Sequence, residues 1–276
     1  MKEYQKKYTL SNGVEIPKIG FGTWQVKNGE EAYQSVALAL KNGYIHIDTA
    51  LAYGNEESVG KAIKDAKIAR EDIFVTTKLP AEIKTYEEAE KAFLTSIKNL
   101  DLDYIDLYLI HAPWPWSDMG KDCKEGNVKI YKVLEKYYKL GKIKAIGVSN
   151  FFPDDLQNII DNCEIVPQVN QIGYFIGMDQ HETIEYCRAK SIFIEAYSPL
   201  GIGYLLANED IKIVAEKYDV SSAQICLRYL LQKGVVALPK STHEFRIIQN
   251  SELDFEILED DMNFLDTIKG DPRRWE

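Results

Sequence analysis

The chain has 276 residues, of which 45% are hydrophobic and 28% are charged, a globular composition that excludes intrinsic disorder as its main character. Its formal net charge of −10 disfavours binding to the phosphate backbone of nucleic acids, although a local basic pocket could still bind one phosphate. The length fits about two ordinary domains, or one barrel of alternating strands and helices with roughly 250 residues.

The N-terminal segment is charged and lacks the apolar core of a signal peptide. The apolar runs are far shorter than the roughly 20 residues that span a bilayer. We therefore expect a cytoplasmic protein with no membrane partner. The four cysteines and four histidines form no Cys-x-x-Cys or His-x-x-x-His spacing, so we expect reduced thiols and no metal site.

The elements predicted in chain order begin with a hairpin, because Asn12-Gly13 between two β-rich segments favours a type I′ turn. The chain then alternates between β-rich and helical segments. The strands are predicted at residues 18–22, 44–48, 74–78, 104–111, 145–149, 167–171, 193–197 and 235–240. Apolar residues recur with helical period at residues 30–42, 87–100, 128–140 and 222–232.

Local signals mark the ends of several helices. Gly43 and Gly141 follow predicted helices, at positions where a C-terminal cap favours a residue with positive φ. Thr85 followed three residues later by Glu88 predicts a capping box at the start of the helix over residues 87–100.

Eight strands, each followed by helical sequence, predict a (β/α)8 TIM barrel that comprises residues 1–276 as a single domain, with an N-terminal β-hairpin and a short C-terminal tail. An open, doubly wound sheet is the alternative. A Rossmann sheet that binds a dinucleotide would carry Gly-x-Gly-x-x-Gly after its first strand. The chain has Gly20-Phe21-Gly22 and Gly201-Ile202-Gly203 without the third glycine, so a nicotinamide cofactor would not bind through a Rossmann turn.

Titratable side chains gather where three consecutive strands end. Asp48, Lys78 and His111 end strands, and Tyr53 follows Asp48 in its loop. In a TIM barrel these ends share one face, where chemistry takes place. A cation beside Tyr53 would lower the pKa of its phenol and make it a proton donor near neutral pH, and His111 could orient a carbonyl oxygen. Each residue alone has an ordinary structural explanation, but their combination predicts an active site.

These residues resemble the motifs of the aldo-keto reductase superfamily. The resemblance runs in family order from residue 20 to about residue 250. It rests on Gly20-Phe21-Gly22-Thr23-Trp24, Ile47-Asp48-Thr49-Ala50, Ala52-Tyr53-Gly54-Asn55-Glu56, Thr77-Lys78-Leu79, Leu109-Ile110-His111, Gly147-Val148-Ser149-Asn150-Phe151, Val169-Asn170-Gln171, Tyr197-Ser198-Pro199-Leu200-Gly201 and Pro239-Lys240-Ser241.

The resemblance implies an enzyme, a TIM-barrel oxidoreductase that transfers a hydride from NADPH to the carbonyl of an aldehyde or ketone and binds no metal. It assigns Tyr53 as the general acid, with Lys78 and Asp48 assisting it and His111 orienting the carbonyl. The implied cofactor-binding residues are Gly22, Thr23, Asp48, Ser149, Asn150, Gln171, Tyr197, Ser198, Leu200, Lys240, Ser241, Thr242, Arg246 and Asn250. Lys240 and Arg246 would hold the 2′-phosphate, because two cations can clamp a phosphate.

Three departures from the family pattern concern the substrate and the adenine. Gln249 stands where glutamate is usual, and His111-Ala112-Pro113-Trp114 replaces His-Trp-Pro. We predict that Trp24, Tyr53, His111 and Trp114 bind the substrate. The tail after Gly270 is short, and since long tails shape the pocket in relatives, we expect an open pocket.

Two other functions remain open at this point. One is a non-catalytic, NADPH-binding regulatory subunit on the same fold, and the other is a barrel lyase that forms a Schiff base through Lys78. For the enzyme we expect a monomer with a small-molecule carbonyl substrate whose identity the sequence does not give.

Overall fold

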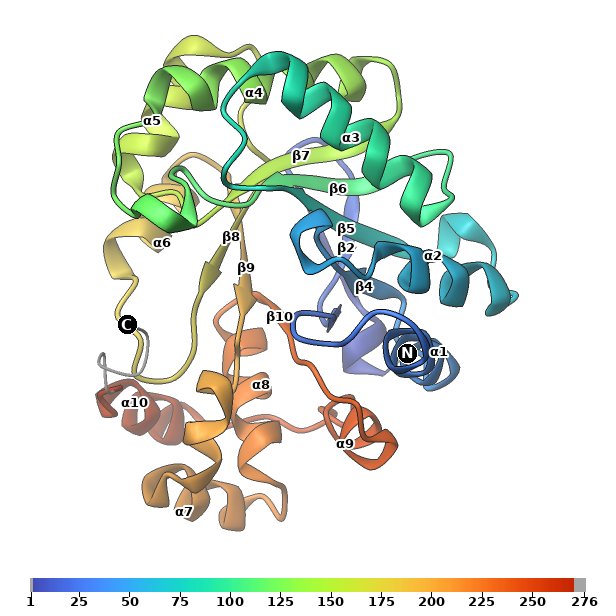
Figure 1. The fold of residues 1–276 in the computed structure, drawn as a ribbon. Helices are drawn as coiled ribbons and strands as arrows, with labels where there is room; N and C mark the ends of the chain where they lie inside the picture. The colour runs from blue at the N-terminus through green and yellow to red at the C-terminus, as the bar shows by residue number, and fades with distance from the viewer. Residues whose placement is uncertain (1, 271–276) are drawn as a thin grey trace.

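The computed structural model describes residues 2–270, and its centre is a sheet of eight parallel strands (Figure 1). The strands are paired in sequence order from β3 to β10. Their bounds are β3 Phe21–Gly22, β4 His46–Asp48, β5 Phe74–Leu79, β6 Ile105–Ile110, β7 Ile143–Ser149, β8 Val169–Gly173, β9 Phe193–Tyr197 and β10 Val236–Leu238.

Contacts between the first and last strands close the sheet into a barrel. Ile19, just before β3, forms a parallel bridge with Ala237 of β10. The backbone N–H of Gly20 donates to the carbonyl of Ala237 at 2.9 Å, and that of Gly22 donates to Pro239 at 3.0 Å. A Cβ at Gly20 would lie 2.5 Å from Leu238, so a residue without a side chain permits this close approach. The predicted (β/α)8 barrel is confirmed, and the open sheet is wrong.

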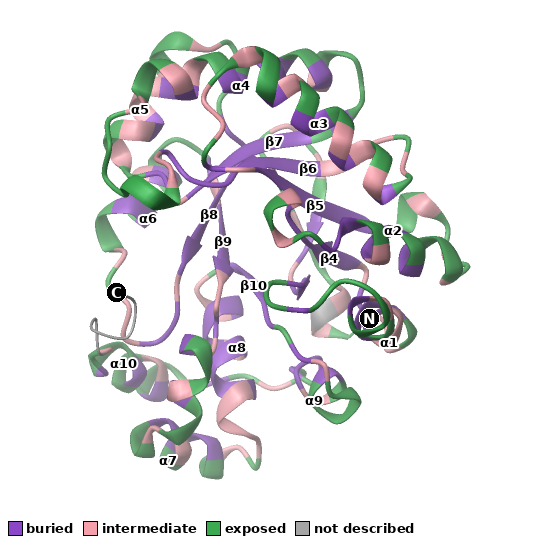
Figure 2. Cartoon of the chain, viewed as in Figure 1, coloured by how far each residue is buried: buried purple, intermediate pink, exposed green. Residues whose placement is uncertain are grey.

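Helices cover the outside of the barrel (Figures 1 and 2). Each turns an apolar face inward: in α1 the buried residues include Val36, Ala39 and Leu40. The bounds are α1 Glu30–Lys41, α2 Glu56–Asp65, α3 Tyr86–Leu100, α4 Lys124–Lys139, α5 Pro153–Asn162, α6 His181–Ala189, α7 Glu209–Lys217, α8 Ser222–Gln232, α9 Glu244–Gln249 and α10 Glu259–Thr267. No helix within residues 2–270 is both long enough and apolar enough to cross a membrane.

An N-terminal hairpin packs against the interior of the barrel. Its strands β1 (Lys7–Thr9) and β2 (Glu15–Pro17) are antiparallel. Leu10 and Ile16 belong to a buried cluster with side chains of the barrel strands, such as Leu107 and Val169. The hairpin is confirmed, but the type I′ turn is wrong. Leu10 pairs with Val14 across a three-residue loop, and only Gly13 of that loop has a positive φ, at 85°, so the loop is a type I turn with a bulge at glycine.

The helix ends agree only in part with the sequence. Gly43 and Gly141 have φ of 89° and 70°, as a left-handed C-terminal cap requires. The capping box at Thr85 is wrong, because this residue makes no side-chain cap. Its hydroxyl donates instead to the carboxylate of Glu88 at 2.5 Å. The last residues of the chain, 271–276, lie outside the described residues, so the single domain over residues 1–276 and the effect of the short tail stay predictions.

Candidate active site

A buried ion pair lies at the carboxyl ends of β4 and β5. The side chain of Lys78 is fully buried, and its Nζ donates to Oδ1 and Oδ2 of Asp48 at 2.7 and 2.8 Å. Nζ also donates to the carbonyl of Thr49 at 2.9 Å. These three acceptors replace the water that the ammonium group loses on burial, so the cation is held in one place.

Tyr53 lies beside this pair, in the short 3-10 helix η2 (Leu51–Tyr53) after β4. Its Oη is 3.4 Å from Nζ of Lys78, and its ring meets the ring of His111 edge to face, with centroids 5.6 Å apart. The structure therefore brings together all four of the residues Asp48, Tyr53, Lys78 and His111. Gly54, in the left-handed region at φ 68°, ends η2 directly after the tyrosine.

The pKa of Tyr53 differs from the sequence-based expectation. Burial raises the pKa of this phenol above its usual value, and the attraction of Lys78 opposes the increase without cancelling it. Burial also disfavours the charged form of Lys78, but Asp48 and Tyr53 raise the pKa of Lys78 above its usual value. Lys78 thus acts in the expected direction, but burial outweighs it, and the expected net lowering of the Tyr53 pKa is wrong. The phenol carries its proton at neutral pH, as a proton donor must.

His111 is a neutral imidazole in this site. Burial lowers its pKa to about 3, and the charge of Lys78 acts in the same direction. Its Nδ1 makes no hydrogen bond to any of residues 2–270. A neutral ring can offer an N–H to a ligand oxygen without bringing a second cation next to Lys78.

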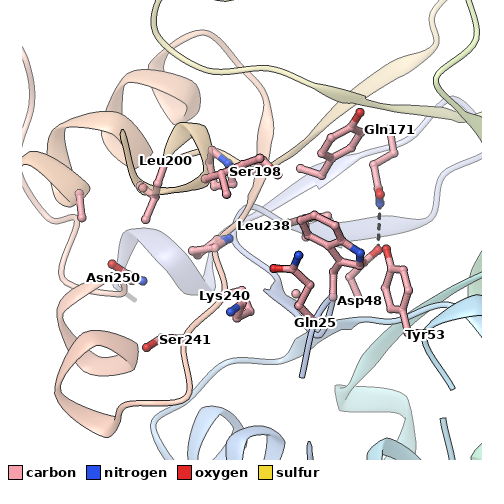
Figure 3. A pocket seen from close by; sticks show the side chains of 18 of the residues that line it. Gln25, Asp48, Tyr53, Gln171, Ser198, Leu200, Leu238, Lys240, Ser241 and Asn250 are labelled. Atoms are coloured by element: carbon pink, nitrogen blue, oxygen red, sulfur yellow. Dashed lines mark hydrogen bonds between the residues drawn. The ribbon is translucent and has the colours of Figure 1, made fainter. Parts of the chain in front are cut away.

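Asp48, Tyr53 and His111 line a cavity of about 1120 Å³, and Lys78 contacts Asp48 without lining it (Figure 3). Asp48 and Tyr53 are at one side of the view, and Lys240, Ser241 and Asn250 are at the other. Of the predicted site residues, those that line the cavity are Gly22, Trp24, Asp48, Tyr53, His111, Ser149, Asn150, Gln171, Tyr197, Ser198, Leu200, Lys240, Ser241, Arg246 and Asn250. Those absent from its lining are Thr23, Lys78, Trp114 and Thr242.

Polar side chains at the ends of β7, β8 and β9 form a connected group next to His111. Asn150 has a left-handed backbone, with φ of 62°, and its Nδ2 donates to the carbonyl of His111 at 3.0 Å. The hydroxyl of Tyr197 donates to Oδ1 of Asn150 at 2.8 Å, and that of Ser149 donates to the carbonyl of Gln171 at 2.8 Å. These bonds hold the side chains of Asn150, Tyr197 and Ser149 in place along the cavity, where a flat polar ring could stack against them.

Beyond β9 the backbone curves around the cavity. Ser198, Gly201, Ile202 and Gly203 all have positive φ, from 50° to 95°. Ser198, Leu200, Ile202 and Gly203 line the cavity. Ser198 and Ile202 are not glycine, and such strained positions often lie next to ligands.

The far end of the cavity is basic. Lys240 and Arg246 are both exposed and line the cavity, and neither forms an ion pair with an acidic side chain within the described range 2–270. Ser241 and Asn250 lie beside them, mostly buried. Two cations without partners and a hydroxyl suit a phosphate group.

The aromatic wall differs from the predicted one. Trp114 is absent from the cavity lining, whereas Trp116 and Met119 line it. The ring of Trp116 lies perpendicular to that of His111, with centroids 5.7 Å apart, and Trp114 packs behind it at 5.2 Å. The cavity lining thus favours Trp116 over the predicted Trp114, and the substrate-binding role of either ring stays a prediction. The alternation of proline and tryptophan in Pro113-Trp114-Pro115-Trp116 left open which ring faces inward.

Two polar residues that the sequence did not single out hold the loop after β6. Lys84 donates to the carbonyl of Ala112 at 3.0 Å and to Oδ1 of Asn127 at 2.9 Å. Asn127 donates in turn to the carbonyl of Pro113 at 2.8 Å. Both loop carbonyls directly after His111 are thereby fixed. No spacing in the sequence signals this contact, because Lys84 and Asn127 are 43 residues apart.

Known proteins resemble nearly the whole of this chain. A model of the aldo/keto reductase family matches residues 18–269. The glyoxal reductase of Bacillus subtilis (strain 168) is 47% identical over 265 residues, which is 96% of this chain and 93% of that protein. An aldo/keto reductase from Brucella melitensis has a solved structure with a TM-score of 0.88 and 42% identity, covering 94% of this chain and 98% of that one.

A further solved structure is that of an aldo-keto reductase from Bombyx mori in complex with NADP. Its TM-score is 0.85 at 33% identity, over 94% of this chain and 91% of that one. The family match covers the barrel from the bridge at Ile19 to α10, and the four clustered residues lie within it. The chain belongs to the aldo/keto reductase family and is an oxidoreductase.

Proposed function

We propose that the chain reduces the carbonyl group of aldehydes or ketones with NADPH, with Tyr53 as the general acid. The observation that carries this proposal is the position of Tyr53 Oη, 3.4 Å from an ammonium group that Asp48 holds in place at the base of the cavity. The cation stabilises the phenolate that remains after proton transfer, so the proton leaves more readily as negative charge develops on the substrate oxygen.

His111 completes the proposed site for the carbonyl oxygen. Its ring lies edge-on to Tyr53, and its imidazole is neutral. An oxygen between Tyr53 and His111 would accept hydrogen bonds from both, which orients the carbonyl and stabilises the developing alkoxide. Trp24, Trp116 and Met119 supply the apolar surface beside it.

The residues present fit NADP(H). Ser149, Asn150 and Gln171 offer polar groups for the carboxamide next to Tyr197 as a stacking surface, and Lys240 and Arg246 suit the 2′-phosphate. The remaining contacts are proposed for Gly22, Thr23, Ser198, Leu200, Ser241, Thr242 and Asn250. The cofactor supplies the hydride, and the protein supplies position and electrostatics. The NADP complex of the Bombyx mori relative supports this assignment.

A steady-state assay tests the proposal. Purified protein is mixed with NADPH and a panel of aldehydes and ketones, and the loss of NADPH absorbance is followed. The panel starts with glyoxal, because the name of the Bacillus subtilis relative includes it. Multiple turnovers with at least one carbonyl compound are expected. Binding of NADPH without turnover of any of them would favour a regulatory subunit.

The lyase alternative conflicts with the environment of Lys78. A Schiff base requires an accessible, neutral amine, whereas this amine is buried, makes three strong hydrogen bonds and has a raised pKa. Treatment with borohydride and a carbonyl substrate is therefore expected to leave the peptide that contains Lys78 unmodified, as mass spectrometry of a digest measures.

The basic end of the cavity gives a prediction on cofactor choice. Arg246→Ala is expected to raise Kd for NADPH by about 10- to 100-fold, because a charge-assisted contact to phosphate contributes about 1.5–3 kcal/mol. Kd for NADH, which lacks the 2′-phosphate, is expected to change less than about twofold. Titration of protein fluorescence with both cofactors measures this. Equal losses for the two cofactors would contradict the phosphate role.

The position of Trp116 in the cavity lining gives a prediction on substrate binding. Trp116→Ala removes a ring that lines the cavity. Because this residue is 41% exposed, only part of the about 1.5–3 kcal/mol for a buried apolar side chain is lost, and KM for aromatic aldehydes is expected to rise by about three- to tenfold. Trp114→Ala is the matched control, because Trp114 does not line the cavity, and its KM is expected to stay close to wild type. A reversed order of the two variants would restore Trp114 as the pocket wall.

The cytoplasmic location, the monomeric state and the absence of nucleic-acid or membrane partners stay predictions. The net charge of −10 supports the part that concerns nucleic acids. Analytical gel filtration coupled to light scattering tests the monomer.

A further inference from the structure

A second buried carboxyl group lies behind the cavity and has no part in the proposed mechanism. Glu195 is the central residue of β9, and its side chain is fully buried. Its Oε2 accepts a hydrogen bond from Nε2 of Gln171 at 2.7 Å. The same Nε2 donates to Oδ2 of Asp48 at 2.9 Å, the bond drawn in Figure 3.

These two bonds determine the orientation of the Gln171 amide. An NH₂ group has two hydrogens, and here both are donated to carboxyl oxygens of Asp48 and Glu195. Gln171 also lines the cavity, so its free polar atom toward a ligand is the acceptor Oε1. Glu195 therefore positions Gln171, and it lies one hydrogen bond behind a residue of the cavity wall.

The other oxygen of Glu195 has a sparse environment. Oε1 makes no hydrogen bond within residues 2–270 and lies 3.5 Å from Nε2 of His46. Nε2 of His46 already pairs with Oγ1 of Thr76 at 3.0 Å. Burial lowers the pKa of His46 to about 3, so its ring is neutral and supplies no positive charge to Glu195. Neither Gln171 nor neutral His46 therefore provides a counterion for an ionised Glu195.

The charges around Glu195 come from three elements of the barrel. Asp48 and neutral His46 face it from β4, Lys78 from β5 and Tyr53 from η2. Its neighbours across the strands, Gln171 on β8 and Val236 on β10, carry no charge. Lys78 is already paired with Asp48. An ionised Glu195 would thus be a negative charge without a counterion in the interior.

Burial and the negative charge of Asp48 raise the pKa of Glu195 to about 8, against the opposing effects of Gln171 and Lys78. The group is mostly protonated at neutral pH and can lose its proton under mildly alkaline conditions. A positive charge placed in the cavity next to Gln171 would supply the missing counterion and favour that loss.

We propose that Glu195 positions Gln171 and that its ionisation makes the site favour the oxidised cofactor over the reduced one. This inference rests on the proposed binding of NADP(H). The oxidised nicotinamide ring carries one positive charge, and the reduced ring carries none. Binding of the oxidised form therefore stabilises the Glu195 carboxylate and releases its proton, whereas binding of the reduced form does not. By linkage, a rise in pH strengthens binding of NADP⁺ relative to NADPH.

The size of the effect follows from the distance between the Glu195 carboxylate and the nicotinamide ring, which the Gln171 amide separates. Unit charges roughly 10 Å apart in a medium with an effective dielectric constant near 20 change an equilibrium by on the order of tenfold. The ratio of Kd for NADPH to Kd for NADP⁺ is therefore expected to rise about tenfold as the pH increases through the range just below the pKa of Glu195, and then to level off. Ionisation of the 2′-phosphate cancels in this ratio, because both cofactors carry that group.

The experiment compares the wild type with Glu195→Gln. Glutamine has the shape of a protonated glutamate and can accept from Gln171, but it cannot ionise. Kd for NADPH and for NADP⁺ is measured from about pH 6 to about pH 9.5, and calorimetry in two buffers with different ionisation enthalpies measures proton release. The wild type is expected to show the rising ratio and to release part of a proton with NADP⁺. The variant is expected to keep the low-pH ratio throughout and to release none.

Tyr53→Phe separates Glu195 from the other titratable group at the ring. If Glu195 is the group that ionises, this variant retains both the rising ratio and the proton release. A wild-type ratio that does not change with pH would overturn the proposal, as would a pH-dependent ratio in Glu195→Gln. If Glu195→Gln fails to fold, proton release on NADP⁺ binding by both the wild type and Tyr53→Phe supports the proposal, and its absence from either protein overturns it. Failure of both cofactors to bind the wild type would instead contradict the proposed function.

Discussion

Tyr53→Phe is expected to lower kcat/KM for aldehyde reduction by about 10²- to 10⁴-fold, the contribution typical of a positioned general acid. The change removes one oxygen, the atom 3.4 Å from Nζ of Lys78. The ring and its edge contact with His111 remain, so the shape of the cavity is kept. Kd for NADPH is expected to change less than about threefold. Steady-state kinetics and cofactor titration measure the two quantities.

His111→Gln is the matched control for this result. Glutamine keeps a hydrogen-bond donor but cannot place it as the imidazole does, so this variant is expected to impair orientation and to raise KM together with a smaller loss in kcat. Turnover of Tyr53→Phe at more than about a tenth of the wild-type rate would show that another group, or water, supplies the proton.

Asp48→Asn is expected to lower both stability and activity, because it leaves the buried ammonium group of Lys78 without its counterion. Loss of one partner of a buried pair costs about 3–5 kcal/mol of unfolding free energy. In this site Asp48 is the only carboxylate among residues 2–270 that contacts Nζ of Lys78 within 4.0 Å. Urea denaturation measures the unfolding free energy, and kcat/KM is expected to fall at least about a hundredfold, since the cation would no longer be held beside Tyr53.

A double variant separates the two effects. Asp48→Asn combined with Lys78→Met removes both charges, and it is expected to recover most of the unfolding free energy, because apolar groups often replace a buried ion pair without loss. Its kcat/KM is expected to stay low, since no cation remains to stabilise the Tyr53 phenolate. If the double variant were no more stable than Asp48→Asn, the loss would come from packing and not from an unpaired charge.

Much of the fold was evident in the amino-acid sequence. Eight β-rich segments alternating with helical ones predicted the barrel, because the number and order of elements depend on local hydrophobic period and on turn residues. The predicted strands at residues 74–78 and 193–197 correspond closely to β5 and β9. The same strand-end positions grouped Asp48, Lys78 and His111, since the ends of parallel strands in a barrel share one face. Tyr53 joined this group through its place in the loop after Asp48, and family motifs added the cofactor residues.

Local chemistry at single positions was less predictable. Asn12-Gly13 was compatible with a type I′ turn and with the type I turn and bulge that the structure has. The Thr85–Glu88 spacing was compatible with a capping box and with the direct side-chain bond that forms instead. Trp114 and Trp116 are two residues apart in a proline-rich loop without a regular period, so the sequence does not determine which ring lines the cavity.

Burial and long-range contact were decided by the tertiary structure alone. The sequence indicated that a cation lies next to Tyr53, but the sign of the phenol's pKa change depends on how much water the closed barrel excludes. The amide of Gln171 bonds to Asp48, 123 positions away, and to Glu195 on the neighbouring strand β9, and no spacing in the sequence signals either contact. A sequence pattern encodes the direction and period of side chains along one element, whereas the closure of the barrel determines which of those side chains share an interior without water.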